Sequence, residues 1–200
     1  MEVQVERRTQ DLPTLVLLVF APTRVLFESN FARKRFAIGS WSFFFLLANC
    51  IFLFMLSTLK SHIHFLPGIY VLLWMLPFSR IVEIGYAFYN DSCDQLESKQ
   101  PRSGLSRVQR LKLLGRSYVE VSICYASLYL ALPNDSFVKA PTTGFGSLYF
   151  SWITITTTGF GEITPTSPLS RGLCMSEIGV GLMLIVFAVG TYFSYRAVDQ

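Results

Sequence analysis

Residues 156–162 read Thr-Thr-Thr-Gly-Phe-Gly-Glu, a short polar stretch that contains two glycines. Because glycine tolerates positive φ, the backbone of Thr-Thr-Gly-Phe-Gly can alternate its conformation and turn successive carbonyl oxygens toward one axis. Carbonyl oxygens arranged in this way can replace the water around a cation. Irregular backbone at membrane depth survives only where it is buried in protein or lines a wet cavity. Residues 157–161 therefore predict an ion-conducting pore, provided that the neighbouring elements place them within a membrane.

The segments on either side of this stretch have the lengths that such a pore requires. Ser147–Thr156 is aromatic and apolar, and at ~1.5 Å per residue it would reach only about halfway across a hydrocarbon core of ~30 Å. That is the length of a re-entrant helix, whose C-terminal dipole favours a cation beyond its end. Gly172–Tyr195 follows, with Glu177 as its one charged residue, and it is long enough to span.

The stretch resembles the selectivity filter of potassium channels, Thr-Val-Gly-Tyr-Gly, with Thr157, Thr158, Gly159, Phe160 and Gly161 in the five places. The resemblance implies that K⁺ ions bind at the first four of these residues. Phenylalanine in place of tyrosine occurs in potassium-selective relatives. Threonine at 158, where valine or isoleucine is usual, puts a hydroxyl behind the filter and leaves a weakly selective cation pore as an alternative.

The resemblance runs from about residue 147 to about residue 194 and includes an acid, an Ile-Thr-Pro exit, an arginine and a glycine: Glu162, Ile163–Pro165, Arg171 and Gly181. It implies that Glu162 stands at the outer mouth, concentrating cations or bracing the filter against Trp152 or Thr156. Gly181 has two open explanations, a hinge that lets the last helix bend and close helix packing. Gly179 could share either role.

The same five letters occur earlier, at Thr142–Gly146. A filter needs a short helix before it, and the residues before this first copy include Pro133 and Pro141, which break helices. We therefore assign the filter to the second copy and expect the first to lie in an outer loop.

The composition indicates a membrane protein, because 52% of the 200 residues are apolar and 15% are charged. The basic residues flank apolar segments rather than form a basic domain, so we expect no nucleic-acid partner. The four cysteines lie far apart, which indicates neither a zinc site nor a disulfide framework.

Four segments are long and apolar enough to cross a bilayer: Trp41–Leu59, Phe65–Tyr89, Leu113–Leu132 and Gly172–Tyr195. Basic residues concentrate before the first segment and between the second and third. By the positive-inside rule both termini are cytoplasmic, in a plasma membrane or a bacterial inner membrane. The first apolar run, Leu12–Ala21, is too short to span and lacks a cleavage site, so we read it as an interfacial segment and not as a signal peptide.

Charged residues near the second and third segments carry three further expectations. Arg80 and Glu83 lie three residues apart, and we expect them to pair with each other rather than form a voltage sensor, which needs several regularly spaced arginines. Glu120 and Arg116 should reach the membrane interface from one end of the third segment. Leu105–Arg116 should form a separate amphipathic helix along the membrane surface, where its basic residues could bind anionic lipids.

The sequence thus predicts an all-α polytopic membrane protein with four transmembrane helices, a re-entrant pore helix and a selectivity filter. Its expected parts are a cytoplasmic N-terminal segment (1–35), a peripheral helix pair (36–89), a cytoplasmic basic linker (90–117) and a pore domain (118–196). One pore unit cannot enclose an axis, so the resemblance implies a homotetramer among membrane lipids.

The expected activity is passive potassium conduction without enzyme chemistry, and without a cofactor other than the permeant K⁺ ions. A transporter subunit and a non-conducting membrane sensor or scaffold stay open as alternatives of other classes. Carriers often show paired broken helices in two related halves, whereas this chain has one broken segment.

Overall fold

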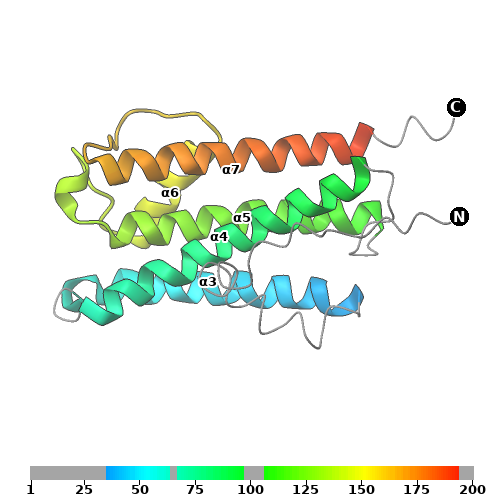
Figure 1. Cartoon of the computed structure of the whole chain (residues 1–200). Coiled ribbons are helices and arrows are strands. Elements are labelled where there is room, and N and C mark those ends of the chain that lie inside the picture. The colour runs from blue at the N-terminus through cyan, green and yellow to red at the C-terminus, as the bar shows by residue number, and fades with distance from the viewer. Residues whose placement is uncertain (1–34, 64–66, 97–105, 194–200) are drawn as a thin grey trace, which may run out of the picture.

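The computed structural model describes residues 35–63, 67–96 and 106–193, and the regular elements in these ranges are helices. They are α3 (Arg35–Ile63), α4 (Pro67–Leu96), α5 (Arg107–Ala131), the short 3₁₀ turn η1 (Asn134–Ser136), α6 (Gly144–Ile155) and α7 (Pro168–Phe193). The long helices lie side by side, and α6 packs between α5 and α7 (Figure 1). The predicted all-helical class is confirmed for this part of the chain.

Helix α5 lies at the centre of the bundle and contacts α3, α4, α6 and α7. Every residue from Glu120 to Leu132 is buried, as expected for a helix that is covered all round. Because an α-helix has 3.6 residues per turn, residues on opposite faces of α5 contact different neighbouring helices. One face, toward α6 and α7, includes Tyr118, Ser122, Tyr125 and Tyr129, and the other, toward α3 and α4, includes Glu120, Ile123, Ala126 and Leu130.

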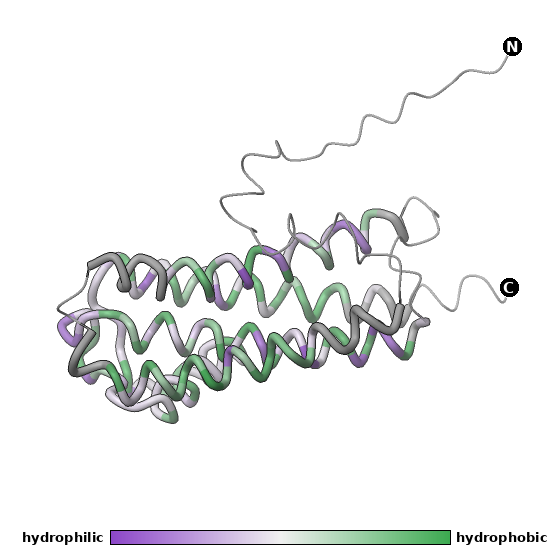
Figure 2. The backbone as a smooth tube through the Cα atoms, turned by 90° about the horizontal axis from the view of Figure 1, so that it is seen from below, coloured by the Kyte–Doolittle hydropathy of each residue, from purple (hydrophilic) through white to green (hydrophobic). Residues whose placement is uncertain are grey.

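Two of the described helices are long and apolar enough to cross a membrane, with windows at Ser42–Leu59 in α3 and Pro168–Phe187 in α7. Figure 2 shows hydrophobic residues along much of the length of the helices. Many of them point outward: Ile51 is 61% exposed, Phe54 is 71% exposed and Met175 is 74% exposed. Large apolar side chains on the outside of long helices are typical of a membrane protein, because lipid rather than water surrounds them.

The predicted surface helix Leu105–Arg116 and the predicted third span are one helix, which corrects the expectation of two elements. Ser106 begins α5 with a capping box, in which its hydroxyl accepts from the amide of Gln109 and the side chain of Gln109 accepts from the amide of Ser106. This cap satisfies the first free amides of a helix that then continues without a break. The basic residues after Ser106 are therefore the first turns of the central helix.

Two further boundaries differ from expectation. The polar loop predicted from residue 90 begins later, because α4 continues to Leu96. The first Thr-Thr-Gly-Phe-Gly copy is not an outer loop: Thr143 accepts a hydrogen bond from the amide of Gly146 at 3.0 Å, and Gly144 begins α6. The N-cap threonine overrides the low helix propensity of the glycines. The predicted N-terminal segment up to residue 34, residues 97–105 of the basic linker and the C-terminal end after residue 193 lie outside the described residues.

A buried ionic cluster connects α3, α4 and α5. The predicted pair is confirmed, with Arg80 Nη1 at 2.8 Å from Glu83 Oε2. The same guanidinium also binds Glu120, with 2.5 Å between Nε and Oε1. Asn49 of α3 donates to the Glu120 carboxylate at 3.4 Å, and Arg80 stacks on the ring of Phe45 at 4.3 Å. Glu120 is fully buried, so the expectation that it reaches the membrane interface is wrong.

A second junction connects α3 with α6. Ser57 Oγ accepts the backbone amide of Gly144, the first residue of α6, at 2.9 Å. The helices approach so closely that a Cβ on residue 144 would lie 3.3 Å from the Cβ of Ser57. The first turn of a helix leaves its amides without partners inside the helix. One of them is therefore satisfied by a helix that is distant in the sequence.

Replacing Arg80 with Gln should strongly destabilise the bundle, because Glu120 would remain buried without its cation. Loss of one partner of a buried pair costs roughly 3–5 kcal/mol. Thermal unfolding of the purified chain in detergent, followed by circular dichroism, measures this effect. Lys112→Gln, at an exposed position on α5, is the control, and Arg80→Gln combined with Glu120→Gln should recover part of the loss. Equal stabilities of Arg80→Gln and Lys112→Gln would contradict the prediction.

Candidate functional site

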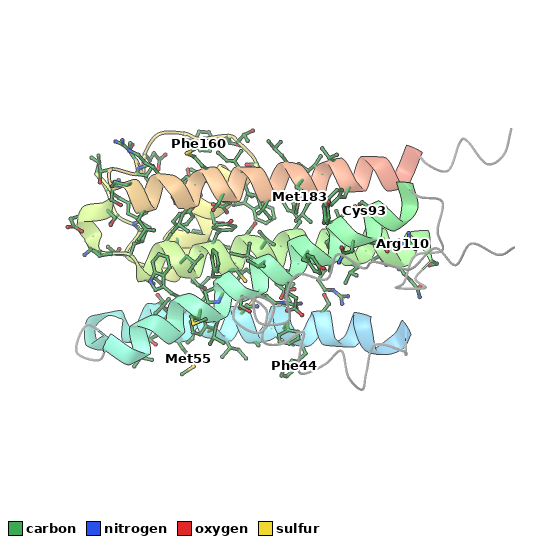
Figure 3. All side chains as sticks on the ribbon, viewed as in Figure 1. Phe44, Met55, Cys93, Arg110, Phe160 and Met183 are labelled. Atoms are coloured by element: carbon green, nitrogen blue, oxygen red, sulfur yellow. The ribbon has the colours of Figure 1, made fainter. Side chains whose placement is uncertain are left out.

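The predicted filter residues lie in the loop that joins α6 to α7. Figures 1 and 3 show this loop beside α7, on the side away from α3, with Phe160 labelled on it. Each residue from Thr156 to Glu162 is exposed in the single chain, and Phe160 is 65% exposed. If α7, which is long and apolar enough to cross a membrane, lies in one, the exposed backbone of this loop needs something other than lipid to cover it.

The loop begins with a Schellman motif at the end of α6. The amide of Thr157 donates to the carbonyl of Thr154 at 2.9 Å, and the amide of Thr158 donates to the carbonyl of Ile153 at 2.9 Å. The residue at the turn of this motif needs a left-handed conformation and is usually glycine. Here it is Thr157, with φ of 57°. A β-branched residue at positive φ is strained, and such strain tends to occur at functional sites.

The sign of φ alternates along the five filter positions. Thr157, Gly159 and Gly161 have φ of 57°, 53° and 81°, whereas Thr158 and Phe160 do not have positive φ. Alternating left-handed and ordinary conformations prevent the carbonyls from reversing at each residue, as they do along a β-strand. The alternation predicted from the glycine spacing is therefore present in the structure.

The carbonyl oxygens of Thr157, Thr158, Gly159 and Phe160 accept no hydrogen bond from any described residue. The carbonyl of Gly161, in contrast, accepts the hydroxyl of Thr164 at 3.2 Å. The amides of the first residues are directed back to the end of α6, as the Schellman motif requires. Four consecutive carbonyls thus remain available for a ligand outside the chain.

The exit from the loop is fixed to the segment that follows α5. The amide of Val138 donates to the carbonyl of Thr164 at 2.9 Å, and the amide of Thr166 donates to the carbonyl of Ser136 at 2.9 Å. The hydroxyl of Ser170, in the first turn of α7, also donates to Ser136 at 2.8 Å. These bonds hold the C-terminal end of the loop, so the loop is anchored at both ends.

The predicted bracing residues are only partly brought together. Thr156 Oγ1 donates to the carbonyl of Trp152 at 2.7 Å and lies 2.9 Å from Thr158 Oγ1. The indole of Trp152 packs edge-on against the ring of Tyr118. Glu162 is exposed and makes no hydrogen bond to either predicted partner within the described chain. The unusual hydroxyl of Thr158 therefore faces another hydroxyl and not Glu162.

Gly181 supports the end of α6 by close packing. A Cβ at this position would lie 2.6 Å from Cγ1 of Ile155 and 3.2 Å from its carbonyl oxygen. The same carbonyl accepts the hydroxyl of Tyr118 at 3.3 Å. The contact with Ile155 therefore supports the packing explanation for Gly181. Gly179, in contrast, faces open space. The hinge explanation stays a prediction.

The sequence reasoning gave no role to Glu177, although the structure buries this residue completely on α7. Its carboxyl contacts the hydroxyl of Ser151 on α6 and that of Tyr129 on α5, the latter at 2.6 Å. The signal was present in the sequence, because an ionisable residue inside an apolar span is by default a candidate functional residue.

Comparison with known proteins bears on the same segment. A family model described as an ion channel matches residues 117–196. A protein of Methanocaldococcus jannaschii named "Probable potassium channel protein 2" is 47% identical over 47 residues, which make up 22% of this chain and 14% of that protein. Over residues 117–196 this chain is therefore similar to ion channels, and part of it is similar to a protein named as a potassium channel. No solved structure matches the chain.

The matched segment, residues 117–196, contains most of α5, all of α6, the loop with the predicted filter and α7, whereas α3 and α4 precede it. The helices of the matched segment contact one another, and α5 also contacts α3 and α4. The ionic cluster and the Ser57–Gly144 hydrogen bond therefore connect the matched segment with the helices before it.

Replacing Gly181 with Ala should disturb the end of α6, because the added methyl overlaps Ile155. Overpacking of this kind costs roughly 1–3 kcal/mol. Gly179→Ala, two residues away on the same helix with open space around it, should be tolerated. Thermal unfolding of both variants in detergent compares them directly. Equal melting temperatures would show that the contact with Ile155 is not tight in the native protein.

Proposed function

We propose that this chain conducts potassium passively across a membrane, through a pore formed by four copies around a shared axis. The carbonyl oxygens of Thr157, Thr158, Gly159 and Phe160 would replace the hydration shell of K⁺. The observation that carries the proposal is the alternation of φ along a loop whose first four carbonyls accept no hydrogen bond from the described residues. The family of residues 117–196 and the printed name of the archaeal relative support it.

Assembly into a tetramer would provide what a single chain lacks. One filter loop cannot surround an ion, and its exposed backbone needs cover from neighbouring copies. The outward stripe of α7, with Met175, Leu182 and Val186 at 74%, 51% and 64% exposure, offers an apolar surface for a neighbouring copy. The C-terminal end of each α6 would add about half a negative charge facing the cavity, which favours a cation there.

In the proposed topology α3, α4, α5 and α7 cross the membrane and both termini are cytoplasmic. Basic residues before α3, between α4 and α5 and in the first turns of α5 support this orientation by the positive-inside rule. The filter loop would then open to the outside, with Glu162 at the outer mouth. The chemistry is passive permeation, without a catalytic step or a resident cofactor.

A weakly selective monovalent cation channel is the second candidate. Its support is the pair of hydroxyls at Thr156 and Thr158, 2.9 Å apart directly behind the filter. Either hydroxyl can donate in this contact, whereas an aliphatic side chain at 158 would only pack, so the surroundings of the filter backbone differ from those in the usual pattern.

Purified protein in liposomes should show a potassium-driven flux, and Gly159→Ala should abolish most of it. Alanine at φ of 53° is strained by about 1–2 kcal/mol in every copy, which favours rotation of the peptide out of the filter geometry. We expect a loss of at least about tenfold, since 1.4 kcal/mol is a factor of ten. Gly172→Ala, with open space around it, is the control.

The absence of flux from wild-type liposomes that contain folded protein would contradict the proposal and favour a membrane sensor or scaffold. Carrier-mediated flux saturates as the ion concentration rises. A saturating flux that is unchanged in Gly159→Ala would favour a transporter subunit. Circular dichroism of each variant separates loss of conduction from loss of folding.

Replacing Thr158 with Val should raise the selectivity for potassium over sodium, because the aliphatic side chain removes the hydroxyl contact with Thr156. Reversal potentials under bi-ionic potassium and sodium measure the ratio directly. Thr158→Ser keeps the hydroxyl and removes the methyl, so it is the matched control. Its potassium-to-sodium permeability ratio should stay near that of the wild type. An unchanged ratio in Thr158→Val would show that the hydroxyl does not set selectivity.

A further inference from the structure

Glu177 lies where three helices of the matched segment, α5, α6 and α7, meet. It lies on α7 with no exposed surface. One carboxyl oxygen contacts Ser151 Oγ on α6, and the other accepts the hydroxyl of Tyr129 on α5 at 2.6 Å. Ser151 and Tyr129 are themselves buried. These contacts form a closed polar cluster, the carboxyl clamp, which consists of Glu177, Ser151, Tyr129 and the carbonyl of Ser122.

The number of protons available to the hydrogen bonds of the carboxyl clamp indicates whether Glu177 is protonated. Ser151 Oγ lies 2.8 Å from the carbonyl oxygen of Ser122 as well as beside Glu177. A hydroxyl has one proton and a carbonyl has none. If Ser151 donates to Ser122, the proton between Ser151 and Glu177 has to belong to the carboxyl group. With a neutral carboxyl group, every contact in the clamp has one donor and one acceptor.

The charges around the clamp point to the same state. No Lys, Arg or His forms an ion pair with Glu177 in the part of the chain that the structure describes. A buried carboxylate without a cation is very unfavourable, and such a group binds a proton instead. Arg80 serves Glu120, which lies on the opposite face of α5 from Tyr129.

The other titratable groups near Glu177 are acids that are neutral at neutral pH. From α5 these are Tyr118, Tyr125 and Tyr129. From α7 it is Cys174, whose Sγ lies 3.5 Å from the Tyr129 hydroxyl. Helix α6 presents Ser151, while its Tyr149 lies on another side of that helix. Since each of these groups can only become negative, none of them supplies a positive charge that would offset the burial of an ionised Glu177.

The clamp also lies where it can position the filter. Ser151 is one turn before Ile155, and Gly181 is one turn after Glu177 and packs against Ile155. Thr157, the first filter residue, bonds back to the same last turn of α6. Movement of Ser151 away from α7 would therefore shift the turn from which the filter starts.

We propose that Glu177 is a neutral carboxylic acid in the working protein and a positioning residue that fastens α6 to α5 and α7 behind the filter. Its proton is donated to Ser151. As pH rises and the proton is lost, the clamp opens and conduction falls. This inference rests on the proposed function, because the filter is the element that the clamp positions.

Flux in liposomes between neutral and alkaline pH tests the role in conduction. Glu177→Gln keeps an N–H donor for Ser151 and an oxygen acceptor for Tyr129, and it cannot ionise. It should conduct at a level within about twofold of the wild type at neutral pH and resist the alkaline loss. Glu177→Ala should lose at least about tenfold at every pH, since it leaves buried hydroxyls without partners. A Gln variant that is as weak as Ala, or that shows the wild-type alkaline loss, would overturn the proposal.

Infrared spectroscopy of the purified protein tests the protonation state without any flux. The carbonyl band of a protonated carboxylic acid should be present at neutral pH, absent from Glu177→Gln and retained in Asp135→Asn, which removes an exposed carboxylate. If wild-type protein shows no flux but keeps this band, the proposed function fails and the neutral clamp stands. If the protein conducts but the band is missing at neutral pH, the clamp fails and the proposed function stands.

Discussion

The C-terminal turn of α6 is the constraint on which the rest of the site depends. The carbonyls of Ile153 and Thr154 hold the amides of the first filter residues and force Thr157 into a left-handed conformation. Those amides are thereby directed away from the loop, and the carbonyls that follow are left for an external ligand. Tyr118 and Gly181 fix the same turn from α5 and α7. The C-terminal turn of α6 is thus held by contacts with both neighbouring helices.

Much of the candidate site could be predicted from local sequence. The two glycines tolerate positive φ, and the segment before them is too short to span, so the sequence predicted the order of short helix, irregular loop and long helix. The start of α6 was placed too late because glycines and a proline argue against a helix. The capping hydroxyl of Thr143 and the acceptor on Ser57 reverse that preference, and the latter is distant in the sequence.

The roles of the buried acids could not be predicted in the same way. Glu120 and Glu177 both lie in apolar surroundings, but a sequence does not show which helix face meets which neighbour. The structure gives Glu120 a guanidinium partner and Glu177 only hydroxyl partners. Because the nature of the partner influences whether a buried carboxyl group can be charged, two residues of the same type lie in different electrostatic surroundings on opposite sides of α5.

The hydrogen bond between Ser57 and Gly144 has a consequence for how the chain divides into parts. Helix α6 is held at its N-terminal end by a helix outside the matched family segment and at its C-terminal end by helices inside it. A fragment cut at the family boundary would therefore leave an amide without its acceptor, and Glu120 without its guanidinium. The matched segment therefore has buried polar groups whose partners lie on α3 and α4.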